Sequence, residues 1–94
     1  MKPRKDKAHI ARVVKLNCIA CRRIFGITDS AAEAQHVREG RRPRNDREVL
    51  PLCALHHRLG SCTIHFHKRA LLQEMGVSSE QELLDEVEQL LTYH

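Results

Sequence analysis

"AEAQHVREGRRPRNDREVLPLCALHHR", residues 32–58, is the stretch of sequence that decides the fold. Residues 31–37 fit a strand or an irregular segment, and residues 47–53 fit a short apolar strand. Residues 38–46 between them are rich in turn-forming and basic residues, which is typical of a loop. Residues 54–60 fit a two-turn helix that ends at a glycine. The stretch therefore predicts a strand, a basic loop, a strand and a helix.

The chain before this stretch reads as an arm followed by one short element. Residues 1–7 are polar and basic, so we expect a flexible arm, with a single domain over residues 8–94. Residues 8–16 fit either a helix or a strand, because the segment contains two adjacent β-branched valines, which are compatible with both. Two cysteines then indicate a turn within residues 17–27. Clearer patterns come only from residue 67 onward.

Two helices are expected at the C-terminal end. Residues 67–76 form the first, with Gly76 as its C-terminal cap. Ser79 and Glu82 have the spacing of a capping box at the start of the second. Its apolar residues fall on one stripe: Leu83, Leu84, Val87, Leu90 and Leu91. This stripe predicts packing against the core, and an interface with another protein is the alternative.

Size and charge restrict the function classes. The 94 residues include only three aromatic side chains, two Phe and one Tyr, so the core is small and a metal would help to hold it together. The formal net charge is +4, with basic residues before position 70 and only acidic ones from Glu74 onward. This separation favours nucleic acid as the partner, and a solvated basic face is the alternative.

No apolar run approaches the ~20 residues needed to span a bilayer, and no signal-peptide pattern opens the chain. We therefore expect a cytoplasmic protein with no membrane partner. Thiols stay reduced in that compartment, so the four cysteines indicate a metal site more than disulfides.

A structural zinc site is the strongest local prediction. Cys18 and Cys21 form a CxxC pair, and Cys53 and His56 supply two more ligands, which together make a closed Cys₃His set. The alternatives are ordinary small buried residues or a redox pair. His57 is close to the same helix face, but adjacent helical residues point ~100° apart. One of the two histidines is thus free for other chemistry.

The free histidine has a counterpart on the first strand. Cutting a phosphodiester needs a base to activate water, a cation to stabilise charge on the phosphate, and basic residues to hold the backbone. His36 on the strand, His57 on the helix and the arginines of the loop supply these parts if strand and helix face each other across a cleft.

Four segments together, "CIAC", "AEAQHV", "VLPLCALHHR" and "IHFHKRALLQEMG", resemble the HNH (ββα-metal) endonucleases. More narrowly, they resemble the phage Ref-like, RecA-dependent nucleases, which pair a cysteine-zinc knuckle with an HNH site. The resemblance covers about residues 14–91. It implies a small zinc-stapled ββα-metal domain of the α+β class with C-terminal helices. It also implies DNA cleavage in phage or prophage recombination, with a RecA filament as a partner.

The resemblance also assigns roles to residues. His36 matches the general base, His57 a ligand of the catalytic metal, and His56 the last zinc ligand. His65 matches a further metal or phosphate ligand. Family members usually have His or Asp before the base, where this chain has Gln35, whose uncharged amide binds a divalent ion more weakly. Mg²⁺ or Mn²⁺ would then sit between His57, Gln35 and His65.

The residue that orients the base is not fixed by this comparison. Asn45 is a candidate catalytic residue for that role, with a turn residue as the alternative, and Asp46 lies beside it. Basic side chains are expected to bind DNA phosphates. They are Arg38, Arg41, Arg42, Arg44, Arg47, Lys68 and Arg69. With few aromatic residues to stack on bases, we expect backbone contacts and weak sequence preference.

Two other function classes stay open. The first is a zinc-knuckle DNA-binding module that has lost catalysis, which Gln35 would explain. The second is a protein-interaction adaptor that uses the acidic final helix, which an exposed leucine stripe would favour.

Overall fold

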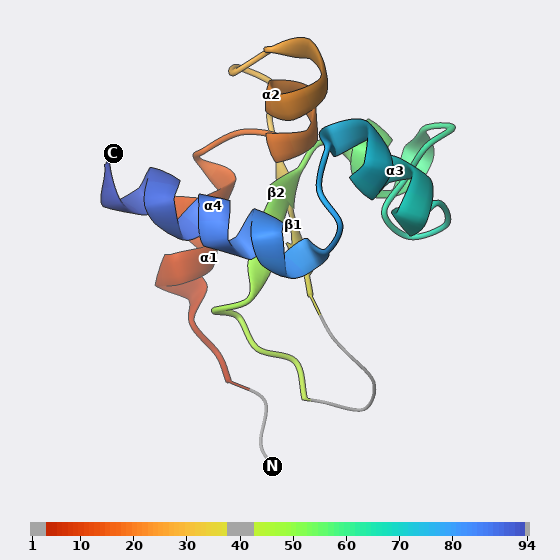
Figure 1. Ribbon diagram of the computed structural model, residues 1–94. Helices are drawn as coiled ribbons and strands as arrows, with labels where there is room; N and C mark the ends of the chain where they lie inside the picture. Colours follow the sequence, from red (N-terminus) through yellow and green to blue (C-terminus); the bar gives the residue numbers. More distant parts are fainter. Residues whose placement is uncertain (1–3, 38–42, 94) are drawn as a thin grey trace.

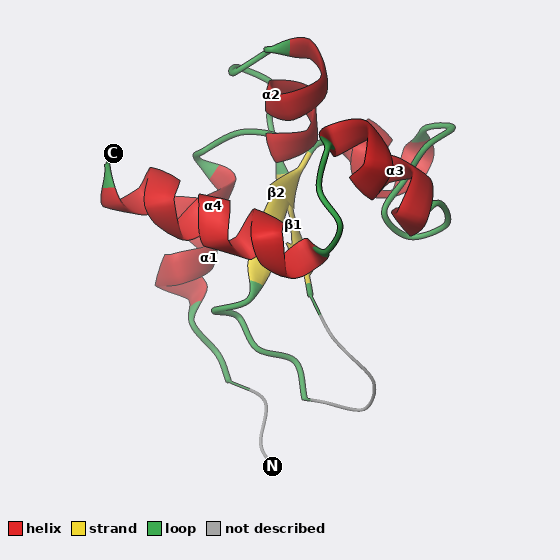
Figure 2. Ribbon diagram, viewed as in Figure 1, coloured by secondary structure: helices red, strands yellow, loops and turns green. Residues whose placement is uncertain are grey.

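The computed structural model describes residues 4–37 and 43–93. It confirms the α+β class, with a two-stranded sheet surrounded by helices (Figures 1 and 2). The elements are α1 (Lys7–Val14), α2 (Ile19–Phe25), β1 (Glu33–His36), β2 (Val49–Leu52), the π-helix η1 (Leu55–Leu59), α3 (Lys68–Met75) and α4 (Glu80–Thr92). The predicted order of strand, loop, strand and helix is thus present as β1, β2 and η1.

The two strands form an antiparallel hairpin in which Gln35 pairs with Leu50. β2 is buried along its whole length, whereas every residue of β1 is half-buried. β2 continues through Pro51, which pairs with Ala34. A proline is tolerated there because each strand of a two-stranded sheet has a free edge, where its missing N–H is not needed. The half-buried β1 leaves polar side chains accessible at the sheet.

The core lies between this sheet and the helices. α1 and α4 both pack against β2 and against each other, as Figure 1 shows. The leucine stripe of α4 faces this core: Leu83, Leu84 and Val87 are buried, and Leu90 and Leu91 are partly buried against it. The capping box is also present, with Glu82 accepting from the Ser79 N–H at 3.1 Å. Because the stripe packs inside, it offers no exposed leucine surface for an adaptor.

The cysteine turn is followed directly by a helix that the sequence did not predict. Cys18 is the N-cap of α2, and its Sγ accepts from the Cys21 N–H at 3.3 Å. α2 ends at Gly26, whose φ of 68° is left-handed and suits a glycine. The CxxC pair therefore occupies the first turn of a helix, and its thiols are fixed by helical geometry.

The short helix after β2 is wider than the predicted α-helix. In η1 the Gly60 N–H donates to the Leu55 carbonyl, five residues earlier, at 2.8 Å. A Cβ on Gly60 would lie 2.5 Å from that carbonyl oxygen, so only glycine fits. Single π-turns often occur at functional sites. η1 carries both His56 and His57.

Part of the expected arm is described, and it contacts the loop before β2. The Arg4 N–H donates to the Arg44 carbonyl at 3.0 Å, and the Asp46 N–H donates to the Arg4 carbonyl at 2.9 Å. Asp6 caps α1 by accepting from the His9 N–H at 3.0 Å. Among the described residues the longest helix, α4, has 13 residues, and none of the helices is long and apolar enough to cross a membrane.

Candidate functional site

A Cys₃His cluster joins three elements of the fold. Cys18 and Cys21 come from the start of α2, Cys53 follows β2, and His56 lies on η1. Their ligand atoms all lie within 4.8 Å of one another. The Sγ atoms of Cys21 and Cys53 are 3.8 Å apart, and His56 Nδ1 lies 3.8, 3.6 and 3.2 Å from the three sulfurs. Ligand atoms around a tetrahedral zinc ion lie about 3.5–3.8 Å apart. The spacings of 3.6 and 3.8 Å match this range, whereas the 3.2 Å between Cys53 and His56 is shorter.

The environment of the cluster suits a soft cation. Cys18, Cys21 and Cys53 are 1%, 7% and 8% exposed. Burial raises the pKa of the Cys18 thiol to about 12 and lowers the pKa of the His56 imidazole. Without a cation Cys18 and His56 thus favour their neutral forms. Burial also raises the pKa of Cys53, but hydrogen bonds from the His56 backbone and from the Cys18 and Cys21 thiols lower it overall. A bound metal deprotonates coordinating thiols outright. The cluster can hold a metal such as zinc, and the half-buried Cys62 is not part of it.

His57 belongs to a second cluster, next to β1. Its Nε2 lies 2.7 Å from Gln35 Oε1, and its Nδ1 lies 2.8 Å from Glu33 Oε1. The ring of His65 is also near, with its centroid 4.7 Å from that of His57. Successive strand side chains alternate between faces, so Glu33 and Gln35 share the face of β1 that meets η1. The structure therefore brings together the three residues that the sequence predicted around a catalytic metal.

Glu33 is a member of this cluster that the sequence reasoning missed. Arg58 donates to both carboxylate oxygens of Glu33, at 3.1 and 2.8 Å. This pairing, together with the hydrogen bond to His57, lowers the pKa of Glu33 to about 2. An ionised carboxylate can only accept a hydrogen bond, so Nδ1 of His57 carries the proton. The period of two along β1, from Gln35 back to Glu33, was the signal that could have found this residue.

The amide of Gln35 is oriented by a separate contact. Its Nε2 donates to the His36 carbonyl at 3.0 Å, which points Oε1 toward His57. Gln35 Oε1 can only accept, so the 2.7 Å contact is bridged either by a proton on Nε2 of His57 or by a metal ion. The geometry of this pair is thus compatible with a bound metal ion.

His36 has a different partner. Its Nε2 lies 2.8 Å from Asp46 Oδ1, with side-chain exposures of only 16% and 11%. Asp46 also accepts from the Asp6 N–H, which lowers the pKa of its carboxyl together with the His36 contact. Asn45 instead accepts from the Arg47 N–H at 2.9 Å, as a turn residue does. Asp46, which the sequence reasoning noted without a role, is thus the hydrogen-bond partner of His36.

The two histidines are not in direct contact. Within residues 4–37 and 43–93, no hydrogen bond or ring contact joins His36 to His57. His36 is the last residue of β1, next in the chain to Gln35 but on the opposite face of the strand. The expected pairing of His36 with His57 across a cleft is thus not present among the described residues, where each histidine has its own partners.

The basic residues are placed only in part. Arg38, Arg41 and Arg42 lie outside the described residues. Arg44 is exposed, and Arg47 pairs with Asp6 at 3.1 Å while staying 39% exposed. Lys68 and Arg69 are exposed at the start of α3, and Lys68 pairs with Glu80 at 2.9 Å.

Comparison with known protein families identifies the family of the chain. Residues 4–92 match the family described as recombination enhancement, RecA-dependent nuclease. No curated protein and no solved structure shows a match. The matched region contains both clusters and all the described helices and strands. The resemblance to the RecA-dependent nucleases is confirmed, and the chain belongs to the family described as recombination enhancement, RecA-dependent nuclease.

Proposed function

We propose that this protein is a metal-dependent DNA endonuclease of the HNH type that acts in recombination together with a RecA filament. One observation carries the metal dependence. Nε2 of His57 and Oε1 of Gln35 lie 2.7 Å apart, each held by a separate neighbour, so a divalent ion could replace a proton between them. The family supplies the nuclease activity and the RecA dependence.

The residues fit a divalent ion of intermediate hardness. Adjacent ligands of an octahedral ion with bonds of about 2.1 Å lie about 3 Å apart, close to the observed spacing. An imidazole nitrogen beside an amide oxygen suits Mn²⁺ better than Mg²⁺, which prefers oxygen ligands. His65 is close enough to His57 to be a third ligand. When bound, such an ion would stabilise the negative charge on the phosphate and the leaving oxygen.

His36 is the proposed general base. The pKa of Asp46 is held low by its hydrogen bonds, so its carboxylate accepts from His36 and keeps the proton on Nε2. Nδ1 of His36 is then the acceptor that can take a proton from the attacking water. Asp46 is a positioning residue, because it acts through His36.

The test is a cleavage assay on single-stranded and supercoiled DNA, with Mg²⁺ or Mn²⁺, with and without RecA and ATP. The wild type should cut, more strongly with Mn²⁺ and with the filament. The His36→Ala variant should bind DNA and keep its zinc but not cut. Because both proteins are purified identically, the variant also controls for contaminating nucleases. Cleavage that persists in His36→Ala contradicts the base assignment.

A second function is favoured by the uncharged ligand Gln35. A DNA-binding module that retains the Cys₃His cluster but binds no catalytic metal would still need its basic residues. Zinc-loaded protein that binds DNA and leaves it uncut under all these conditions would support that function. A strong salt dependence of binding is expected in both cases, so it does not separate them.

A further inference from the structure

Phe66 is an aromatic ring held on the surface. Its side chain is 77% exposed, although a phenyl group gains by burial. The Phe66 N–H donates to Oγ1 of Thr63 at 3.2 Å, and Thr63 itself is fully buried. The ring is therefore presented to solvent by a turn that is anchored in the core.

Phe66 stands at the end of a row of rings that begins at the second cluster. Its centroid lies 6.3 Å from that of His65, which lies 4.7 Å from that of His57. His57 in turn contacts Gln35. A nucleotide next to a phosphate bound at the His57–Gln35 pair would thus come close to the exposed ring.

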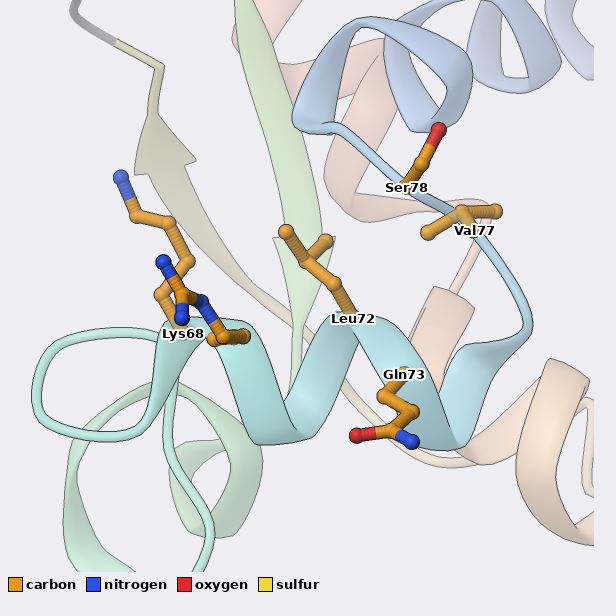
Figure 3. Close-up of a pocket in the computed structure, with 6 residues that line it drawn as sticks. Lys68, Leu72, Gln73, Val77 and Ser78 are labelled. Atoms are coloured by element: carbon orange, nitrogen blue, oxygen red, sulfur yellow. The ribbon is translucent and has the colours of Figure 1, made fainter.

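Two cationic residues follow Phe66 two and three positions later in the chain, and the first of them, Lys68, pairs with Glu80 at 2.9 Å. Lys68 and Arg69 lie at the start of α3 and line an open groove of about 510 Å³ together with Leu72, Gln73, Val77 and Ser78. In Figure 3 the Lys68 side chain extends from the helix at one end of this groove, and Leu72 points into it. An exposed aromatic ring beside cationic side chains is the combination with which proteins bind single-stranded nucleic acid.

We propose that Phe66 is a base-stacking residue, which receives an unpaired base of the DNA strand next to the phosphate that is cut. The ligand class is single-stranded DNA, because the faces of paired bases are covered by their neighbours within a duplex. The position of Phe66 next to the cut phosphate rests on the proposed function. The stacking itself is measured as DNA binding, which does not require cleavage. It also replaces the expectation that only backbone contacts hold the DNA.

The experiment measures binding without cleavage. Fluorescence anisotropy of a labelled single strand and of the matching duplex is recorded for the zinc-loaded protein in a His36→Ala background. Adding Phe66→Ala should weaken single-strand binding about 5- to 100-fold, the range expected for loss of one base–aromatic stack. Duplex binding should hardly change, and Phe66→Trp should restore single-strand binding.

Two controls separate stacking from general damage. Tyr93→Ala removes another exposed ring, 86% exposed, at the far end of α4, and should leave binding unchanged. The slope of affinity against salt should stay the same in Phe66→Ala but fall in Arg69→Ala, because only the arginine neutralises a phosphate.

Three outcomes are distinguishable. Equal single-strand affinity for Phe66→Ala and its parent overturns the proposal. Unchanged binding of bare strands with loss of RecA-dependent cleavage in Phe66→Ala alone also overturns it, and makes the ring a contact for a protein. If the wild type cuts no DNA but Phe66→Ala still loses single-strand binding, stacking is upheld and the nuclease function fails.

Discussion

His36 Nε2 lies 2.8 Å from Asp46 Oδ1, and this contact ties the end of β1 to the loop that precedes β2. Asp46 is buried and receives a second hydrogen bond from the Asp6 N–H at 2.9 Å. The carboxylate is thus fixed from two sides before any substrate arrives. A histidine held in this way has one defined tautomer and orientation.

Replacing this carboxylate should slow cleavage without loss of binding. Asp46→Asn keeps an acceptor for Asp6 but can donate to His36, which favours the wrong tautomer of the base. We expect kcat to fall about 100-fold or more, with little change in KM. The measurement is steady-state cleavage of a labelled strand, alongside zinc content and DNA affinity.

Asn45→Ala is the matched control for this variant. It removes the hydrogen bond to the Arg47 N–H and should cost about 1 kcal/mol of folding free energy or less. Its kcat should stay near the wild-type value. If Asn45→Ala loses cleavage and Asp46→Asn keeps it, the orienting role belongs to Asn45.

A charged ligand at position 35 should strengthen the catalytic metal site. Gln35→Asp places a carboxylate beside Nε2 of His57, where the amide contributes no charge. The Mn²⁺ or Mg²⁺ concentration that gives half-maximal cleavage should fall about 10-fold or more. Titration of cleavage against metal tests this, with His57→Ala as the variant that should need far more metal. An unchanged requirement in Gln35→Asp would place the metal elsewhere.

The sequence predicts those parts of the fold whose pattern lies within one short segment of the chain. The leucine stripe and the capping box of α4 are local patterns, and both were predicted correctly. The π-turn at Gly60 was not, because the choice between an i→i−4 and an i→i−5 hydrogen bond depends on packing around η1. α2 was not predicted because it has only seven residues and begins at the CxxC pair, which by itself indicates a turn.

In the candidate site, the metal ligands were predicted from the sequence, whereas the partners of the histidines were not. The Cys₃His set follows from ligand spacing, and the structure brings all four ligands together. The partners of the histidines come from distant parts of the chain: Glu33 reaches His57 across 24 positions, and Asp6 meets Asp46 across 40. The period of two along β1 relates Glu33 to Gln35, but it does not give their contact with His57, which needs the hairpin and η1. The Asp6–Asp46 contact needs α1.

Removing a ligand of the Cys₃His cluster should unfold the domain. In Cys21→Ser the cluster loses a buried thiol, and metal binding in such small domains supplies much of the folding free energy. We expect loss of bound zinc and a melting transition lowered by more than about 10 °C. Cys62→Ser is the control, because its half-buried thiol lies outside the cluster. Full zinc content in Cys21→Ser, measured by mass spectrometry, would exclude the site.

Acid should destabilise the fold through His9. The side chain is 2% exposed, and its Nδ1 has no hydrogen-bond partner among the described residues. Burial lowers the pKa of His9, and Arg47 and Arg12 add to this, whereas Glu88 and Asp6 oppose it. His9 is therefore neutral in the fold but takes up a proton in the unfolded chain below about pH 6.5. The contribution of neutral His9 to the stability of the fold is complete above about pH 6.5, and it is lost as the pH falls below that value.

His9→Leu should remove the pH-dependent contribution of His9 to the free energy of unfolding. Between pH 7.5 and 5.5 the free energy of unfolding of the wild type should drop by up to about 1.4 kcal/mol more than that of His9→Leu. Urea denaturation of zinc-saturated protein at both pH values measures the difference, and protonation of His56 cancels because both proteins share it. His67→Leu removes an exposed histidine and should behave as the wild type. Equal drops in the wild type and His9→Leu would mean that His9 is protonated to the same extent in the folded and unfolded chains.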